Sequence, residues 1–276
     1  MTSTNGSTQL SPRAVETAAV VAHGRVDVHE AVVRVQAVAD NAGVTVLAAD
    51  ADPRGADLAV ALGGDGTILR TLGKLLGSAV PVIGVNFGRV GFLASIEPDD
   101  LERDLVRVFA GEYAVIELPA LEVQFDGETH TAVNDVVSTS AMLGRMVELQ
   151  WAVGGEDLGT IPCDGMICAT PTGSTAYNLS NGGPVLVRGL DAMAVTFIAP
   201  HSLHARPLVV PRGLDVTLVN RTPDVDVAVL VDGRRVLDVS KGGRVSVRLG
   251  TQRSLLATLP ETTFFGRYHE TFTSHP

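Results

Sequence analysis

The chain is poor in lysine and has no long apolar run, and both shortages exclude classes of protein. Only Lys74 and Lys241 occur among its 276 residues, and neither stands in a G-x-x-x-x-G-K-[ST] motif, so a Walker-type ATP site is excluded. No apolar run approaches the roughly 20 residues that a membrane-spanning helix needs. The formal net charge of −10 argues against binding to nucleic acid or to an anionic membrane surface.

Cysteine is also scarce, and the start of the chain lacks the apolar stretch of a signal peptide. Cys163 and Cys168 lie five positions apart, a poor spacing for a metal site or a disulfide, which favours a reduced, cytoplasmic setting. Residues 1–13 are polar throughout. We expect them to form a disordered start and not a signal peptide.

The pattern of apolar residues predicts two parts of different architecture. Residues 14–115 alternate short apolar runs with amphipathic ones, which is typical of an α/β domain with a parallel sheet and helices on both of its faces. Residues 116–257 contain short strands separated by Gly, Pro, Asn and Asp, which predicts a β-rich domain. A hairpin is expected at Asp126-Gly127 and a single helical segment at about Gly173–Asn181. Residues 258–276 contain an aromatic segment, and we expect them to pack back on the first domain.

The most informative motif is the pentad Gly63–Thr67, which stands between an apolar strand and the start of a helix. Its glycines allow left-handed backbone and close approach of a ligand, and backbone N–H groups at a helix start bind phosphate. A carboxylate, Asp65, lies in the middle of this anion site. Because that charge is unfavourable beside phosphate alone, we interpret the loop as one for phosphoryl transfer.

Two other loops follow predicted strands, and each has two readings. The segment Asn86–Leu93 contains Gly88, Gly91 and Phe92, and is either a glycine-bent loop with core phenylalanines or a ligand loop with Phe92 against an adenine or ribose. Asn134-Asp135 is either a turn or bulge, or an amide and carboxylate pair that holds two vicinal ribose hydroxyls.

The segment Thr170–Ser180 carries five hydroxyl side chains besides Tyr177 near a predicted helix start. It is either a heavily capped helix, with Thr172 or Ser174 as the N-cap, or a surface for adenosine. Ser174 is not framed as G-x-S-x-G, which argues against a hydrolytic serine. His201 and His204 lack a carboxylate to complete a metal site, so no metal ligands are predicted in the chain. Asp232-Gly233 is expected to form a hairpin turn.

Taken together, these motifs resemble the NAD kinase family. The matching segments follow the family's order and cover nearly the whole chain beyond the first fifteen residues; they are Gly63–Thr67, Gly88–Phe92, Asn134-Asp135, Asp164 with Thr170–Tyr177, Gly182-Gly183-Pro184, Arg206-Pro207-Leu208, Asp232-Gly233 and Phe264-Phe265. The resemblance implies transfer of the terminal phosphoryl group of ATP or polyphosphate to the 2′-hydroxyl of the adenosine ribose of NAD, giving NADP. It also implies a C-terminal domain of stacked sheets, a homodimer or homotetramer, Mg²⁺ or another divalent metal with ATP, and no tightly bound organic cofactor.

The resemblance further implies a role for each matching residue. Asp65 would be the catalytic residue, accepting or orienting the proton of the 2′-hydroxyl, and Gly63, Gly64, Gly66 and Thr67 would bind phosphate. The residues implied to bind NAD are Asp65, Gly66, Arg70, Phe92, Asn134, Asp135, Arg145, Asp164, Thr172, Thr175, Ala176, Tyr177, Asn178, Leu179 and Ser180. Asp164 would contact the nicotinamide end or the adenine of a packed neighbour.

The chain departs from the family pattern at three places. Pro162 stands where relatives often have an arginine, which puts an intersubunit phosphate contact in doubt. A terminal tryptophan is missing, and Asp135 replaces a commoner Glu.

Two other functions share part of the pattern. A lipid kinase of the diacylglycerol type has the same pentad, but it would need an apolar acyl cleft and affinity for membranes. A dinucleotide-binding sensor would have no use for Asp65. A dehydrogenase is disfavoured because no G-x-G-x-x-G fingerprint is present.

Overall fold

The computed structural model describes residues 13–23, 26–88 and 91–273. The chain divides into two compact units, one of residues 1–118 and 253–276 and the other of residues 119–252. The sequence placed these divisions after residues 115 and 257. The predicted disordered start lies outside the described residues, except for Arg13.

The first unit contains a parallel sheet. Its strands β1 (Thr17–Ala22), β2 (Thr45–Val46), β3 (Leu58–Gly63) and β4 (Val82–Asn86) lie in the order β2-β1-β3-β4, and the end of β16 (Arg244–Thr258) pairs parallel to β4. Every residue of β3 and β4 is buried. That burial explains their unbroken apolar sequence, since a parallel strand is covered on both faces.

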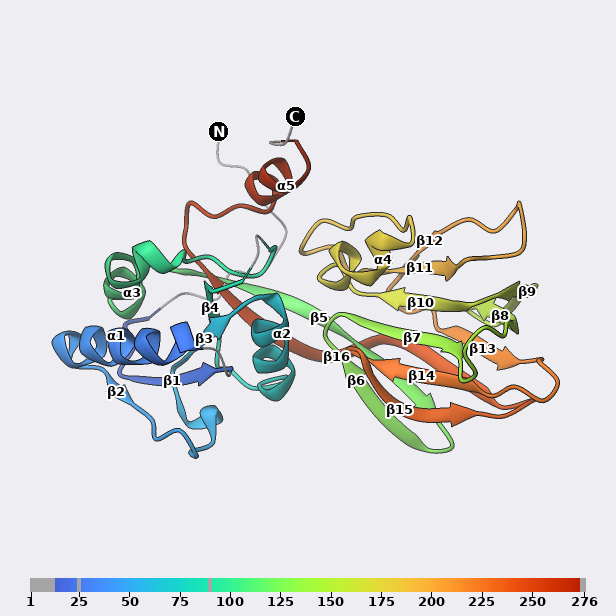
Figure 1. Cartoon of the computed structure of the whole chain (residues 1–276), viewed down its shortest axis with the longest axis horizontal. Helices are drawn as coiled ribbons and strands as arrows, with labels where there is room; N and C mark the ends of the chain where they lie inside the picture. Colours follow the sequence, from blue (N-terminus) through green and yellow to red (C-terminus); the bar gives the residue numbers. More distant parts are fainter. Residues whose placement is uncertain (1–12, 24–25, 89–90, 274–276) are drawn as a thin grey trace. The chain divides into compact units, whose positions relative to one another are not determined.

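Helices cover both faces of this sheet, as the sequence predicted (Figure 1). On one face α1 (Val26–Ala42) and α3 (Leu101–Phe109, after a 3₁₀ turn at Pro98–Asp100) share a core with Val60 and Leu62 of β3. On the other face α2 (Asp65–Lys74) places Ile68 against Gly84 of β4, where any Cβ would collide with it. The remaining helix of the described part of this unit, α5 (Phe264–Phe272), follows β16.

The second unit consists of two antiparallel sheets. In one, the order is β12-β11-β10-β7-β14-β15; in the other, β16 pairs β13, which continues to β8 and β9, and β5 pairs both β16 and β6. Residues of both sheets form one core, in which Trp151 of β8 meets Phe197 of β11 edge to face at 5.2 Å. The strands are β5 (Ala114–Phe125), β6 (Glu128–Ala132), β7 (Asp135–Ser140), β8 (Val147–Val153), β9 (Glu156–Cys163), β10 (Gly165–Ala169), β11 (Ala192–Ile198), β12 (Leu208–Pro211), β13 (Val216–Asn220), β14 (Val227–Val231) and β15 (Arg234–Val239).

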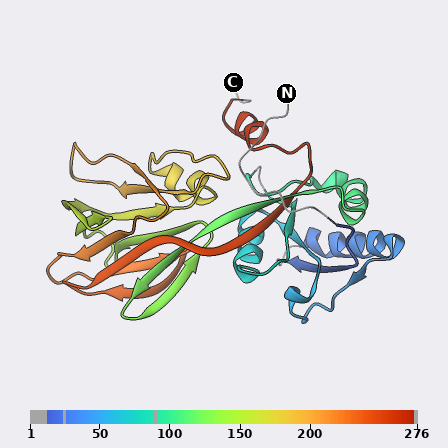
Figure 2. The ribbon, with the colours of Figure 1, turned by 180° about the vertical axis from the view of Figure 1, so that it is seen from behind.

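Several local predictions are confirmed and several are wrong. The hairpin at Asp126-Gly127 joins β5 to β6 as expected. The short strands that the sequence predicted are not all separate: residues 244–258 form the single long strand β16, because the polar residues near its middle stay extended (Figure 2). The helix expected over Gly173–Asn181 is a 3₁₀ turn (Gly173–Thr175) followed by the four-residue α4 (Tyr177–Ser180), since Ala176 leaves helical backbone at φ −101°, ψ −126°.

Both cysteines lie inside the second unit. Cys163 and Cys168 are free and buried, and burial raises the pKa of each thiol to about 12. They are therefore neutral at physiological pH, and each packs as a small apolar side chain. Within the described residues, no helix has the length and apolar character needed to cross a membrane.

Candidate active site

The pentad forms the turn between β3 and α2, as predicted. Gly64 is the N-cap of α2, and its carbonyl accepts the N–H groups of Thr67 at 2.8 Å and Ile68 at 3.3 Å. The backbone N–H of Thr67 is therefore already hydrogen-bonded, and the phosphate contact of Thr67 stays a prediction. Because the first N–H groups of a helix lack intrahelical acceptors, those of Asp65 and Gly66 remain for an anion.

Glycines let the pentad approach its neighbours closely. A Cβ on Gly63 would collide with the side chain of Thr67, and a Cβ on Gly88 would lie 3.0 Å from the Cα of Gly64. The turn after β3 and the loop after β4 are thus in backbone contact. This is the arrangement expected where two neighbouring parallel strands end at one edge of a sheet.

The Asp65 carboxylate is fixed by the loop after β4. Its Oδ2 accepts the N–H of Phe92 at 2.8 Å, and its Oδ1 accepts the N–H of Leu93 at 3.2 Å. A Cβ on Gly91 would collide with this carboxylate, so only glycine fits there. Asp65 is half-buried, and each oxygen keeps a lone pair for another donor. The sequence predicted the carboxylate but not the loop that holds it.

Phe92 lies among aromatic side chains of α5. Its ring is 6.2 Å from that of Phe264 and 5.8 Å from that of Phe272, and the residue is 9% exposed. This packing favours the reading of Phe92 as a core phenylalanine. Arg89 and Val90 of the same predicted loop lie outside the described residues.

In the second unit, Asp232 organises the segment that contains Asn134 and Asp135. Its Oδ1 accepts the N–H groups of Asn134 at 2.7 Å and Asp135 at 3.3 Å, and its Oδ2 accepts that of Val133 at 2.9 Å. Asp232 and Gly233 both have positive φ, as the predicted hairpin turn requires. The turn was predicted, but the role of its carboxylate was missed, because three acceptor bonds across about a hundred residues leave no local sequence signal.

One polar atom of this segment is buried without a protein partner, and a buried acidic residue follows it in the chain. The Oδ1 of Asn134 is buried without a hydrogen bond, and Asp135 is 6% exposed. Burial, and then the charge of Asp232, raise the pKa of Asp135 to about 7. Burial likewise raises the pKa of Asp232, against the effect of its three backbone donors. A buried acidic residue next to an unpaired, buried amide oxygen favours a ligand with hydroxyl donors over a simple turn.

The loop between β10 and α4 packs directly on the same segment. The Thr170 hydroxyl donates to Val133 O at 2.6 Å and accepts from Gly173 N, and a Cβ on Gly173 would collide with the backbone of Asn134. The Thr172 hydroxyl is buried and has no partner. Neither Thr172 nor Ser174 caps the helix by its side chain, which corrects that reading.

Asn178 belongs to the framework of this loop. It is fully buried, its amide donates to Ser174 O and Pro184 O, and its Oδ1 accepts from Thr196. A Cβ on Gly183 would collide with the Asn178 side chain, which explains the glycine there.

The remaining predicted residues lie at or near the surface of their own units. Arg70, in α2, is exposed and donates to the Thr67 hydroxyl at 3.4 Å. In the second unit, Tyr177 and Ser180 are exposed on α4, and Thr175, Ala176 and Leu179 are half-buried beside them. Arg145 and Asp164 are exposed and lie in loops. The Asn134 segment lies at one end of the β7–β10 pair, where Asp135 pairs with Ala169, and these two loops lie at the other end. The fold therefore does not bring Arg145 or Asp164 to the Asn134 segment.

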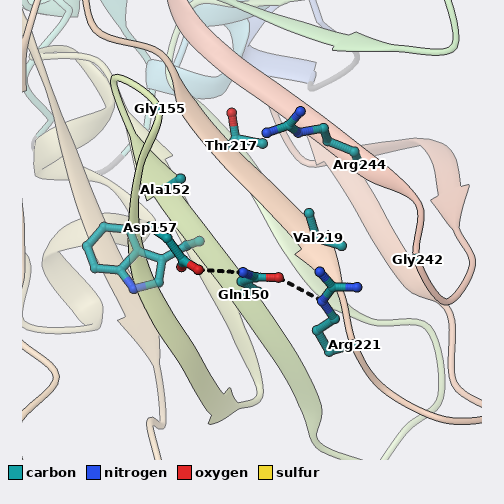
Figure 3. A pocket seen from close by; sticks show the side chains of 10 residues that line it. Gln150, Ala152, Gly155, Asp157, Thr217, Val219, Arg221, Gly242 and Arg244 are labelled. Atoms are coloured by element: carbon teal, nitrogen blue, oxygen red, sulfur yellow. Dashed lines mark hydrogen bonds between the residues drawn. The ribbon is translucent and has the colours of Figure 1, made fainter.

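A well-defined pocket lies elsewhere in the second unit. It measures about 350 Å³ on the outer face of β8, β13 and β16, where Gln150 bridges Asp157 and Arg221 (Figure 3). None of the predicted site residues lines it. The residues that the structure describes contain no group of three metal-ligating side chains, and His201 and His204 are both exposed.

Comparison with known proteins matches the chain to ATP-NAD kinases. The family model of the ATP-NAD kinase N-terminal domain matches residues 9–113, and that of the C-terminal domain matches residues 133–259. NAD kinase of Heliobacterium modesticaldum is 42% identical over 76% of each chain, and NAD kinase 2 of Streptomyces avermitilis is 40% identical over 77% of this chain and 72% of its own.

Solved structures agree with this result. An NAD kinase from Archaeoglobus fulgidus in complex with ATP has a TM-score of 0.78 at 27% identity, covering 93% of this chain and 97% of its own. A yeast NADH kinase complexed with NADH shares the fold, with a TM-score of 0.83 at 23% identity over 96% of this chain and 89% of its own. The resemblance seen in the motifs is therefore confirmed, and the chain belongs to the ATP-NAD kinase family, whose members are phosphotransferases.

Proposed function

We propose that this protein is an NAD kinase that transfers the terminal phosphoryl group of ATP to the 2′-hydroxyl of the adenosine ribose of NAD. The observation that carries the proposal is the fixed Asp65 carboxylate within a glycine turn of a chain that matches both family domains. A lipid kinase and a non-catalytic sensor are not favoured, since the relatives named above are NAD kinases.

The first unit supplies the groups for the transfer. The N–H groups of Asp65 and Gly66 bind phosphate at the start of α2, where the helix dipole favours negative charge. Asp65 accepts or orients the proton of the attacking hydroxyl, through the lone pairs that Phe92 and Leu93 leave free. Positioning and charge neutralisation supply most of the acceleration in such a loose transition state.

The second unit binds the dinucleotide. Asp135 and the Oδ1 of Asn134 accept hydrogen bonds from ribose hydroxyls, and the free Thr172 hydroxyl adds a further contact. Tyr177, Ser180 and their half-buried neighbours Thr175, Ala176 and Leu179 provide an exposed surface beside them for the rest of the nucleotide. Asn178 maintains the shape of this surface from inside.

A divalent cation, Mg²⁺ in the simplest case, enters with the nucleotide. Asp65 is the carboxylate available at the pentad, and Mg²⁺ in kinases binds through one or two carboxylates together with substrate phosphates. When bound, such a cation would supply neutralisation of the phosphate charge, and Asp65 would help to hold it. Among the chain's own residues, Asp65 orients the hydroxyl.

Three finer features stay predictions of the sequence. They are use of polyphosphate as a second donor, a homodimer or homotetramer, and a cytoplasmic location. Each has a direct measurement, namely donor assays, sedimentation and fractionation.

The function is tested by measuring initial rates with NAD or NADH as acceptor and ATP or polyphosphate as donor, with Mg²⁺. The product is assayed with a dehydrogenase specific for NADP. The proposal predicts NADP or NADPH formed at the rate of ADP release with ATP. ATP consumption without a 2′-phosphorylated product, or no turnover with any pair, would overturn it.

A further inference from the structure

Residues 91–94 hold the Asp65 carboxylate with their backbone. Two successive N–H groups, of Phe92 and Leu93, donate to its two oxygens. The following residues return to β4, where Ser95 N and Ile96 N donate to Gly84 O at 3.1 and 3.2 Å. These bonds tie the segment to the sheet from Ser95 onward, and contacts from elsewhere in the unit support residues 91–94 as well.

Those supports come from α5, at the other end of the chain. Phe264 and Phe272 pack on the Phe92 ring, and Arg267 donates to Ala94 O at 3.0 Å. The Arg267 side chain is 13% exposed. Residues 92 and 94 flank Leu93, which donates to Asp65. Both are therefore held by contacts with one helix, the nine-residue α5.

The same arginine reaches the glycine loop by a second route. Arg267 lies 3.6 Å from Glu97, which accepts from Asn86 Nδ2 at 3.3 Å. The Oδ1 of Asn86 in turn accepts from Gly88 N at 3.2 Å, and Gly88 contacts Gly64 of the pentad. Side-chain contacts therefore link both ends of the loop after β4 to α5.

We propose that α5 is a positioning element for the phosphoryl-transfer reaction, with Arg267 and Phe272 setting the orientation of Asp65 through residues 92–94. The inference rests on the proposed function, because it takes Asp65 as the reacting carboxylate. Neither residue contacts Asp65 directly; each acts on the two N–H donors that hold it. Displacement of a reacting group by about 1 Å can cost on the order of a hundredfold in rate, so a loosened loop reduces turnover without removing a ligand contact.

The test compares Arg267→Ala with a matched control, Arg34→Ala. Arg34 of α1 also binds a carboxylate, Glu102, and a backbone carbonyl, Pro98 O at 2.8 Å, but it touches neither residues 91–94 nor α5. We expect Arg267→Ala to lower kcat by about tenfold or more while the KM values for NAD and ATP stay within about threefold. Arg34→Ala should leave kcat unchanged. If Arg267→Ala melts below the assay temperature, Phe272→Leu serves as the second variant. It keeps an apolar side chain, and we expect it to lower kcat as well.

A double-mutant cycle separates positioning from a general loss of structure. In the Asp65→Asn background, Arg267→Ala or Phe272→Leu should change the residual kcat by no more than about twofold, because the group they orient is gone. Equal losses in both backgrounds, or an unchanged kcat in the otherwise wild-type protein, would overturn the proposal. A wild-type protein without NAD kinase activity would instead overturn the proposed function.

Discussion

The candidate site residues of the two units differ in how their polar groups are satisfied. In the first, the Asp65 carboxylate already accepts two backbone N–H groups from its own chain. In the second, the Asn134 amide oxygen and the Thr172 hydroxyl are buried without a hydrogen-bond partner among the described residues, and burial raises the pKa of the Asp135 carboxyl to about 7. A satisfied group is held rigid before substrate arrives, whereas an unsatisfied buried group costs free energy that a ligand recovers. The first unit is therefore built for chemistry and the second for binding.

The largest effect should follow from Asp65→Asn. We expect kcat to fall by about a hundredfold or more, because the group that accepts or orients the hydroxyl proton is lost. NAD binding should persist, since most of the residues expected to bind the dinucleotide lie in the other unit. Steady-state kinetics measure the change, with the exposed Asp99→Asn as a control that keeps full activity. A mutant with nearly normal kcat would refute the role of Asp65.

Asp232→Asn should weaken NAD binding and also lower stability. An amide oxygen cannot serve all three N–H groups that the carboxylate accepts, and an unpaired buried donor costs about 1–3 kcal/mol. We expect KM for NAD to rise by about tenfold as the Asn134 segment loosens. Asp126→Asn is the matched control, because Asp126-Gly127 forms a hairpin turn with the same positive φ values and no side-chain bond is seen for Asp126. Equal effects of the two variants would contradict the role given to Asp232.

The raised pKa of Asp135 predicts a pH dependence of NAD affinity. Its pKa is raised to about 7 in the free protein, so the carboxyl is largely protonated below that pH. Hydroxyl donors bind the ionised form, so affinity should fall by up to about tenfold for each pH unit below 7. Calorimetry from pH 5.5 to 8 measures this, and Asp135→Asn should flatten the profile. A profile of the same slope in that variant would show that another group titrates.

The same shift has a defined sign for stability. Between the unfolded value, 3.8, and about 7, the folded protein holds the Asp135 proton more tightly than the unfolded chain does. The contribution of this group to stability therefore falls as pH rises through that window, which thermal melts of wild type and Asp135→Asn would compare.

The smallest effect on the free protein is expected for Thr172→Val. Its hydroxyl has no partner, so removing it should leave the free energy of unfolding unchanged or slightly higher, within about 1 kcal/mol. NAD affinity should nevertheless decrease. Thr170→Val is the control of opposite behaviour, because it loses a donor bond to Val133 O and an acceptor for Gly173 N, and should destabilise the fold by about 1–3 kcal/mol. If Thr172→Val lost stability but kept its affinity for NAD, the hydroxyl would support the fold and would not contact NAD.

The sequence predicted what depends on local pattern and missed what depends on long-range contact. The β3 strand, the glycine turn and the start of α2 were read directly, because a buried parallel strand and a helix start have local signatures. Strand β9 was missed, since its first five residues are all exposed and show no alternation. The bonds from Asp232 to residues 133–135 and from residues 92–93 to Asp65 join distant segments, so no spacing in the sequence indicates them.

The division of labour between the two units is tested most directly by titrating NAD into Asp65→Asn and into Thr172→Val, with turnover measured on the same samples. The account predicts that Asp65→Asn binds NAD with the wild-type Kd and hardly turns over, whereas Thr172→Val binds more weakly but keeps its kcat. If Asp65→Asn lost NAD binding while Thr172→Val lost only turnover, chemistry and binding would have been assigned to the wrong units.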